Sequence, residues 1–290
     1  MRRTRLLFAV GSCAVLTATA CGSSAGGGEG GGQVDVLYAG SLVSLMQNQL
    51  GPAVKDATGH SVTGFSGGST ALATQIKGKV HAADVFISAS PDVNASLQGS
   101  ANGNWESWYA TFATSELVLG YNPKSKFAAE LKSEPWYQVV TERGFRLGST
   151  DPATDPKGTL AQQALTDTAA RQHDAALTRL AGNKSTVYPE ETLVGRLQSG
   201  QLDAGFFYTS EASAAKIPTV PLTGEDLKAT YTVTILNRAP HDEAAQDFVA
   251  YLLGAKGRKL LERDGFTLVN PPQVTGSGVP KSLRAVLPGA

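Results

Sequence analysis

The sequence predicts an α/β protein with two domains. Short apolar runs alternate with segments of helical periodicity from Val34 to Ala290, and this stretch is long enough for two domains of ordinary size. Strands that alternate with helices are typical of largely parallel sheets. Glycine and serine are concentrated in the loops before the first two helices, at the sheet edge where ligands bind in such proteins.

The individual elements follow from the periodicity of apolar residues. Six apolar runs are predicted as buried strands: 34–38, 83–87, 117–121, 145–148, 204–208 and 231–236. Five segments with helical spacing are predicted as helices: 42–50, 69–76, 159–165, 192–197 and 244–253. The segment 254–266 is expected to form a closing helix, and Asn270-Pro271-Pro272 is expected to end regular structure.

The N-terminus has the features of an export signal. Arg2, Arg3 and Arg5 precede an apolar run from Leu6 to Leu16, which small residues follow. This run is too short to cross a bilayer as a helix, because a spanning helix needs about 20 apolar residues. We therefore expect an exported protein that is not integral to the membrane.

The processing site has two interpretations. Ala18-Thr19-Ala20 is an A-x-A cleavage site, whereas the segment ending at Cys21 resembles a bacterial lipobox, in which the cysteine becomes the first mature residue and carries a lipid. A glycine-rich stretch follows, and such a composition forms a flexible tether. The lipobox is favoured, which predicts a signal peptide over 1–20 and a lipidated Cys21 with its tether over 21–33.

Composition and motifs exclude several classes of protein. The only other cysteine, Cys13, lies in the predicted signal, so the mature chain has no disulfide and no cysteine metal site. The 25 basic and 25 acidic residues balance, which argues against a nucleic-acid partner. No phosphate-binding loop is present, and no dinucleotide fingerprint follows a predicted strand. We therefore expect neither enzymatic activity nor a cofactor.

Ser41 and Ser69 stand where the first two helices begin. One interpretation is that each serine caps its helix. The other is that both hydroxyls, together with the free backbone N–H groups of the helix starts, form a neutral cage that replaces the hydration shell of a dianion. The second interpretation fits a fully deprotonated oxyanion.

Three short segments resemble the molybdate- and tungstate-binding proteins of bacterial and archaeal ABC importers. They are VLYAGSL at 36–42, GGSTALATQI at 67–76 and AADVFISA at 82–89. The resemblance implies a fold of the periplasmic-binding-protein type II, in which two α/β lobes joined by a two-strand hinge hold the ligand in a cleft. It places lobe 1 at 34–115 and 231–290 and lobe 2 at 116–230.

Two segments of lobe 2 extend the resemblance, DPATDPKG at 151–158 and GQLDAGFFYTS at 200–210. The ligand-binding residues that the resemblance implies are Ser41, Ser69, Asp155, Glu190, Glu191 and Tyr208. The expected contribution of Glu190 and Glu191 is a backbone N–H at the start of a helix.

Asp155 has several interpretations, and they imply different ligands. In the tungstate-type branch of the family, an aspartate here and a glutamate before the tyrosine complete a six-coordinate centre on the anion's own metal. Phe207 stands at the glutamate position, so this coordination requires a substitute, with Glu190, Glu191 and Glu211 as candidates. Asp155 is alternatively a turn residue, or an acceptor for the proton of hydrogen phosphate. Lys157 could also neutralise it.

The resemblance implies an extracellular binding protein that captures a tetrahedral oxyanion, with molybdate or tungstate expected, and delivers it to a membrane permease driven by an ATPase. A phosphate- or sulfate-binding protein is the alternative. Ferric iron is disfavoured because Phe206-Phe207-Tyr208 offers one tyrosine where two adjacent phenolates are expected. We expect a monomer, held by its lipid at the outer face of the cytoplasmic membrane.

Overall fold

The computed structural model describes residues 32–289. The predicted signal peptide, Cys21 and nearly all of the tether lie outside these residues, so their assignments remain predictions. Within the described part of the chain, no helix combines the length and the apolar character that crossing a membrane requires.

The strands of residues 32–289 form one mixed sheet. Its order is β2-β1-β3-β8-β4-β6-β5, and both β7 and β9 pair with β4. The strands are β1 (Gln33–Ala39), β2 (Ser61–Gly67), β3 (Val85–Ser88), β4 (Trp108–Tyr121), β5 (Leu147–Gly148), β6 (Ala204–Tyr208), β7 (Thr219–Pro221), β8 (Lys228–Ile235) and β9 (Thr267–Gly276).

The prediction of largely parallel sheets was only partly right. β1 runs parallel to β2 and β3, and β5 runs parallel to β6. β4 and β8, in contrast, are antiparallel to each other and to the strands beside them. The first part of β4 pairs with β8 and β9, whereas its last five residues, 117–121, pair with β6. β4 therefore runs from one part of the sheet into the other.

Helices fill the connections between the strands. They are η1 (Gly40–Leu42), α1 (Val43–Leu45), η2 (Met46–Leu50), α2 (Gly51–Thr58), α3 (Ser69–Lys77), α4 (Pro91–Ala95), η3 (Ser100–Asn102), α5 (Glu130–Ser133), α6 (Trp136–Val139), α7 (Pro156–Gln172), α8 (Ala175–Ala181), η4 (Lys184–Thr186), α9 (Glu190–Gln198), α10 (Thr209–Ala214), α11 (Asp242–Leu253), α12 (Ala255–Arg263) and η5 (Lys281–Ala285). The helix predicted over 42–50 continues to Thr58, and the closing helix is α12.

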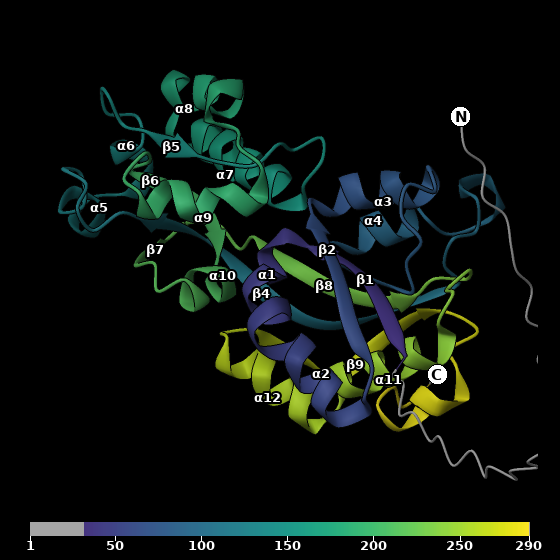
Figure 1. Cartoon of the computed structure of the whole chain (residues 1–290). Coiled ribbons are helices and arrows are strands. Elements are labelled where there is room, and N and C mark those ends of the chain that lie inside the picture. Colours follow the sequence, from purple (N-terminus) through teal and green to yellow (C-terminus); the bar gives the residue numbers. More distant parts are fainter. Residues whose placement is uncertain (1–31, 290) are drawn as a thin grey trace, which may run out of the picture. The chain divides into compact units, whose positions relative to one another are not determined.

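Helices cover both faces of the strands β1, β2 and β8. Figure 1 shows α3 and α4 on one side of these strands and α2, α11 and α12 on the other. Side chains alternate between the faces along β1, because successive residues of a strand point in opposite directions. Val36 packs into the large core cluster, whereas Leu37 packs with Leu72 of α3 and Phe86 of β3 in a second cluster.

We use lobe 1 for residues 34–115 and 231–290 and lobe 2 for residues 116–230. β4 pairs with β8 over its first part and with β6 over its last five residues. The division into lobes and the crossings near Ser115 and Tyr231 remain a prediction.

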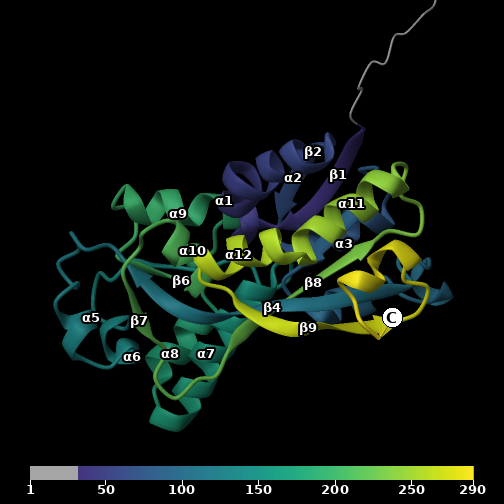
Figure 2. The same ribbon diagram turned by 90° about the horizontal axis from the view of Figure 1, so that it is seen from below.

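The prediction that Asn270-Pro271-Pro272 ends regular structure was wrong. β9 continues through these residues and lies along β4 (Figure 2). Leu268 pairs with Ala113 and Gln273 with Thr111, so the residues between them bulge out of the ladder. Prolines are tolerated at a bulge because no ladder hydrogen bond requires their missing N–H.

Candidate functional site

Five helical segments begin at the place where lobe 1 and lobe 2 meet. They are η1 and α3 of lobe 1 and α7, α9 and α10 of lobe 2. η1, α3 and α10 follow directly on β1, β2 and β6, so the carboxyl ends of these strands deliver the helix starts to one region. The backbone N–H of Ala71 in α3 donates to Thr154 O before α7 over 3.1 Å, which joins the two lobes.

Two glycines allow this close approach. A Cβ atom on Gly68 would lie 2.4 Å from Thr154 O and 3.0 Å from Asp155 Cβ. A Cβ atom on Gly40 would lie 2.5 Å from Glu190 Oε2. A larger residue at Gly68 would therefore push the loops of the two lobes apart, and a larger residue at Gly40 would displace the side chain of Glu190.

The interpretation of the two serines as helix caps was wrong. Ala39 and Gly68 occupy the cap positions, and neither serine side chain bonds to its own helix start. Ser41 Oγ instead lies 2.9 Å from the hydroxyl oxygen of Tyr231 in β8. Ser69 Oγ accepts a hydrogen bond of 3.1 Å from the backbone N–H of Ala89. Both hydroxyls are buried and are held by contacts from outside their own loops.

Asp155 caps a helix with one carboxylate oxygen and leaves the other oxygen without a hydrogen-bond partner. It caps α7, because Oδ1 accepts a hydrogen bond of 2.9 Å from the backbone N–H of Lys157. The other oxygen, Oδ2, is buried and has no hydrogen-bond partner. Burial raises the pKa of Asp155, and the nearby charge of Lys157 offsets only part of that effect. The cap explains one oxygen and leaves the second available to a ligand.

Lys157 lies fully buried among carboxylates. Its Nζ donates to both oxygens of Glu211, at 2.9 and 3.1 Å, and lies 3.2 Å from Glu190 Oε1. Burial alone would lower the pKa of Lys157, but the charges of Glu211, Glu190 and Asp155 outweigh it and hold that pKa above its usual range. Lys157 is therefore a permanent cation that connects the starts of α7, α9 and α10.

Glu190 also presents an unpartnered oxygen toward lobe 1. Oε2 is buried without a hydrogen-bond partner and lies against Gly40. Burial, reinforced by the negative charge of Asp155, raises the pKa of Glu190 well above its usual range. The neighbouring Glu191 is exposed, and its Oε1 would lie 3.7 Å from a Cβ atom on Gly67, so its side chain also faces lobe 1.

Tyr208 places a neutral donor in the same region. Its side chain is fully buried, and its hydroxyl has no hydrogen-bond partner. Burial, followed by the charge of Asp155, raises the pKa of this phenol well above its usual range, so the O–H stays protonated. The ring packs edge-on against Tyr231 with 6.1 Å between ring centroids, which links Tyr208 to Ser41 through Tyr231.

A pocket of about 460 Å³ opens beside these residues. Asp155 and Glu190 line it from lobe 2, and Gly67 and Gly68 line it from lobe 1. Phe65 lies at this pocket and is 44% exposed, which is unusual for a large apolar side chain here. Asp155 and Glu190 thus line the pocket, while their unpartnered oxygens, Asp155 Oδ2 and Glu190 Oε2, are buried behind its wall.

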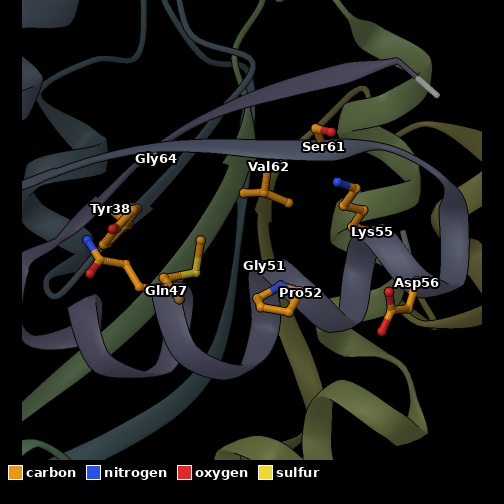
Figure 3. Close-up of a pocket in the computed structure, with 10 residues that line it drawn as sticks. Tyr38, Gln47, Gly51, Pro52, Lys55, Asp56, Ser61, Val62 and Gly64 are labelled. Atoms are coloured by element: carbon orange, nitrogen blue, oxygen red, sulfur yellow. The ribbon is translucent and has the colours of Figure 1, made fainter. Parts of the chain in front are cut away.

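A larger pocket, of about 630 Å³, lies elsewhere in lobe 1, between β2 and the helical stretch from Met46 to Asp56. Figure 3 shows Tyr38 and Gln47 at one end of it and Lys55 and Asp56 at the other. It contains none of the predicted binding residues. Its size therefore does not make it the candidate site.

A separate polar cluster joins β1, the start of β3 and α11. Asp84 is fully buried and accepts hydrogen bonds from the backbone N–H groups of Asp35 and His241, each over 2.7 Å, and its Oδ2 lies 3.0 Å from His241 Nδ1. Within residues 32–289, these three form the one group of His, Cys, Asp or Glu side chains close enough to hold a metal ion. The hydrogen bonds already account for both oxygens of Asp84.

The structure brings the six predicted residues to the region where the lobes meet. Ser41, Ser69, Asp155, Glu190 and Tyr208 are buried there, whereas Glu191 is exposed and lines the pocket. Sequence reasoning missed the role of Tyr231, and it considered Lys157 only as a partner for Asp155. Tyr231 lies in the middle of β8, and the sequence of that strand, KATYTVTI, gives no separate signal for its role.

Comparison with known proteins identifies relatives of this chain. The family model described as bacterial extracellular solute-binding protein matches residues 34–267. A molybdate/tungstate-binding protein WtpA of Thermococcus kodakarensis is 28% identical over 236 residues, which is 63% of this chain and 66% of that protein. A putative ABC transporter molybdenum-binding protein of Haloferax volcanii is 30% identical over 222 residues, which is 76% of this chain and 69% of that protein.

Solved structures give the same picture of the fold. The periplasmic molybdate-binding protein of Azotobacter vinelandii matches with a TM-score of 0.62 and 22% identity, over 81% of this chain and 99% of that one. The likeness confirms the predicted fold class, an α/β fold of the periplasmic-binding-protein type.

Proposed function

We propose, from the premise that this chain belongs to the bacterial extracellular solute-binding proteins, that it is the binding component of an ABC importer. We propose further that it captures a tetrahedral oxyanion, molybdate or tungstate. Membership of this family implies export from the cytoplasm. The relatives that name a ligand support the choice of anion, since those of Thermococcus and Haloferax are named for molybdate, tungstate or molybdenum.

One observation carries the proposal. The starts of α3, α7 and α9 converge from both lobes on a region that holds buried hydroxyl groups, including the unpartnered O–H of Tyr208. Helix starts present free N–H groups and the positive end of the helix dipole, which favour an anion. Hydroxyl and N–H donors together replace the hydration shell that an oxyanion loses on burial.

Capture requires both lobes. Ser41 and Ser69 belong to lobe 1, whereas Asp155, Glu190 and Tyr208 belong to lobe 2. A ligand that contacts both groups is enclosed only when the lobes approach each other, and β4 and β8 are the strands about which such a movement would occur. We propose that the enclosed form docks on the permease, which an ATPase drives.

The predicted N-terminal assignments complete the proposal. A signal peptide over 1–20 and a lipidated Cys21 would hold the binding unit at the outer face of the cytoplasmic membrane, and the glycine-rich stretch to residue 33 would act as its tether. Mass spectrometry of the protein purified from membranes tests this, because a Cys21→Ser variant should lose the mass of the lipid and appear in the soluble fraction.

Phosphate is the second candidate ligand, and one observation favours it. Asp155 Oδ2 is a buried acceptor without a partner, and hydrogen phosphate carries a proton that it can donate, whereas molybdate and sulfate do not at neutral pH. A carboxylate that faces a fully deprotonated dianion is repelled by it unless a proton or a cation lies between them. Asp155 therefore distinguishes between the two ligands.

Isothermal titration of the purified protein with molybdate, tungstate, sulfate and phosphate tests the proposal. We expect submicromolar binding of molybdate or tungstate and none of sulfate or phosphate. If the protein binds phosphate and Asp155→Asn does not, the ligand is hydrogen phosphate and not molybdate or tungstate. No heat from any of the four anions would refute the oxyanion proposal itself.

A further inference from the structure

The charged side chains that meet at the candidate site come from lobe 2. They are Asp155 and Lys157 at the start of α7, Glu190 at the start of α9 and Glu211 in α10. The residues with which lobe 1 meets them, Gly40, Ser41, Gly68 and Ser69, carry no charge. The charge of the site is therefore set by one lysine and the carboxyl groups around it.

Glu211 binds the ammonium group of Lys157 more fully than Glu190 does. Both of its oxygens accept from Nζ, at 2.9 and 3.1 Å, whereas Glu190 offers one oxygen at 3.2 Å. The side chain of Lys157 is 1% exposed and that of Glu211 is 8% exposed, so water hardly screens the pair. Lys157 is fully buried and does not line the pocket, so it acts on a ligand there through its charge, which Glu211 largely neutralises.

The pair lies directly beside the groups that we assign to binding. Nζ of Lys157 is 5.7 Å from the ring centroid of Tyr208, and the backbone N–H of Tyr208 points to Glu211 Oε2 at 3.5 Å. A buried ion pair contributes little net stability, because the loss of hydration offsets the attraction between the charges. Its position next to the unpartnered oxygens of Asp155, Glu190 and Tyr208 indicates a role in the binding site.

We propose that Lys157 is a specificity-determining residue whose positive charge selects an anionic ligand, and that Glu211 lowers the affinity for that ligand by neutralising the charge. This inference rests on the proposed function, because it names the residue that determines the charge of the captured solute.

The test uses the substitution Glu211→Gln, which keeps the shape of the side chain and an acceptor for Nζ. Molybdate and tungstate affinities are measured by isothermal titration at pH 8 in a buffer without competing oxyanions. Glu211→Gln should bind the anion at least about 10-fold more tightly than the parent, because the charge of Lys157 is no longer neutralised. A structural role alone would give weaker binding instead.

The double variant Lys157→Met with Glu211→Gln isolates the lysine. It restores the neutrality of the pair, so its affinity should return to within about 3-fold of the parent. Glu142→Gln is the matched control, since it removes the same charge from an exposed position of lobe 2 and should leave the affinity unchanged. Thermal unfolding of each variant establishes that it is folded, and Glu211→Ser replaces Glu211→Gln if the glutamine variant is not.

Two results would overturn the inference while leaving the proposed function intact. One is a folded Glu211→Gln protein that binds the anion no more tightly than the parent does. The other is a double variant that keeps the full gain, because the gain would then be independent of Lys157. Absence of binding to the parent protein would overturn the proposed function together with this inference.

Discussion

Replacing Glu106 by glutamine is expected to remove a pH dependence of stability. Glu106 is fully buried just before β4; its Oε2 accepts a hydrogen bond of 3.0 Å from Asn94 Nδ2, and its Oε1 has no partner. Burial raises the pKa of Glu106 from 4.5 to about 8, although the hydrogen bond from Asn94 opposes the rise. Asn94 in turn accepts from the hydroxyl of Thr232 in β8, so this network joins both strands of the predicted hinge.

The direction in which stability changes with pH follows from the number of protons that the folded and unfolded states bind. Between pH 4.5 and about 8 the unfolded chain has released the proton of Glu106, whereas the folded protein keeps it. The folded state therefore becomes less stable as pH rises through this range, and the loss is complete above the folded pKa. At about 1.4 kcal/mol per pKa unit the loss is at most about 5 kcal/mol, and relaxation around the charge reduces it to about 2 to 3 kcal/mol.

Urea unfolding at several pH values between 5 and 9 provides the assay. The free energy of unfolding of the parent should decrease across this range by about 2 to 3 kcal/mol more than that of Glu106→Gln, whose side chain cannot ionise. Glu142→Gln, at an exposed position, should behave as the parent does. Parallel profiles for the parent and Glu106→Gln would show that burial does not hold Glu106 in its neutral form.

Three further predictions concern the site and its surroundings. Tyr208→Phe should weaken oxyanion binding by about 10- to 100-fold in isothermal titration, the value of a hydrogen bond to a charged group, without lowering the thermal midpoint, because the lost hydroxyl has no partner in the ligand-free protein. Gly68→Ala should weaken binding by about 10-fold or more, since its Cβ would meet a lobe 2 carbonyl oxygen at 2.4 Å, whereas Gly195→Ala, with no atom near its Cβ, should bind as the parent does. The hydrogen bond to Asp84 raises the pKa of His241, so its stabilising contribution is present below pH 6.5 and is lost as pH rises through the raised pKa; thermal unfolding scans of His241→Gln should lack this decline.

Much of the fold could be predicted because local patterns specify it. The apolar runs at 34–38 and 204–208 became β1 and β6 almost residue for residue, since a buried strand requires a short continuous apolar segment. β9 could not be predicted, because its sequence is interrupted by Pro271 and Pro272. β9 is recognisable as a strand only from its pairing with β4 on both sides of the bulge that contains the two prolines.

The candidate site was predicted where the chain itself presents the residues. Ser41 and Ser69 follow the neighbouring parallel strands β1 and β2, and the carboxyl ends of parallel strands meet at one edge, so their placement at that edge follows from the order of elements. Their hydrogen-bond partners could not be predicted in the same way. Tyr231, which contacts Ser41, is 190 residues away in the sequence.

The sequence by itself therefore determined the alternation of strands and helices, the glycine- and serine-rich loops and the resemblance to oxyanion-binding proteins, because each depends on residues close together in the chain. The tertiary structure alone decided how Lys157 meets Glu211, 54 residues away, and Glu190, and which of their oxygens remain without partners. Long-range side-chain contacts depend on how the starts of α7, α9 and α10 pack against one another. No local pattern of residues encodes that packing, and it sets the charge of the site.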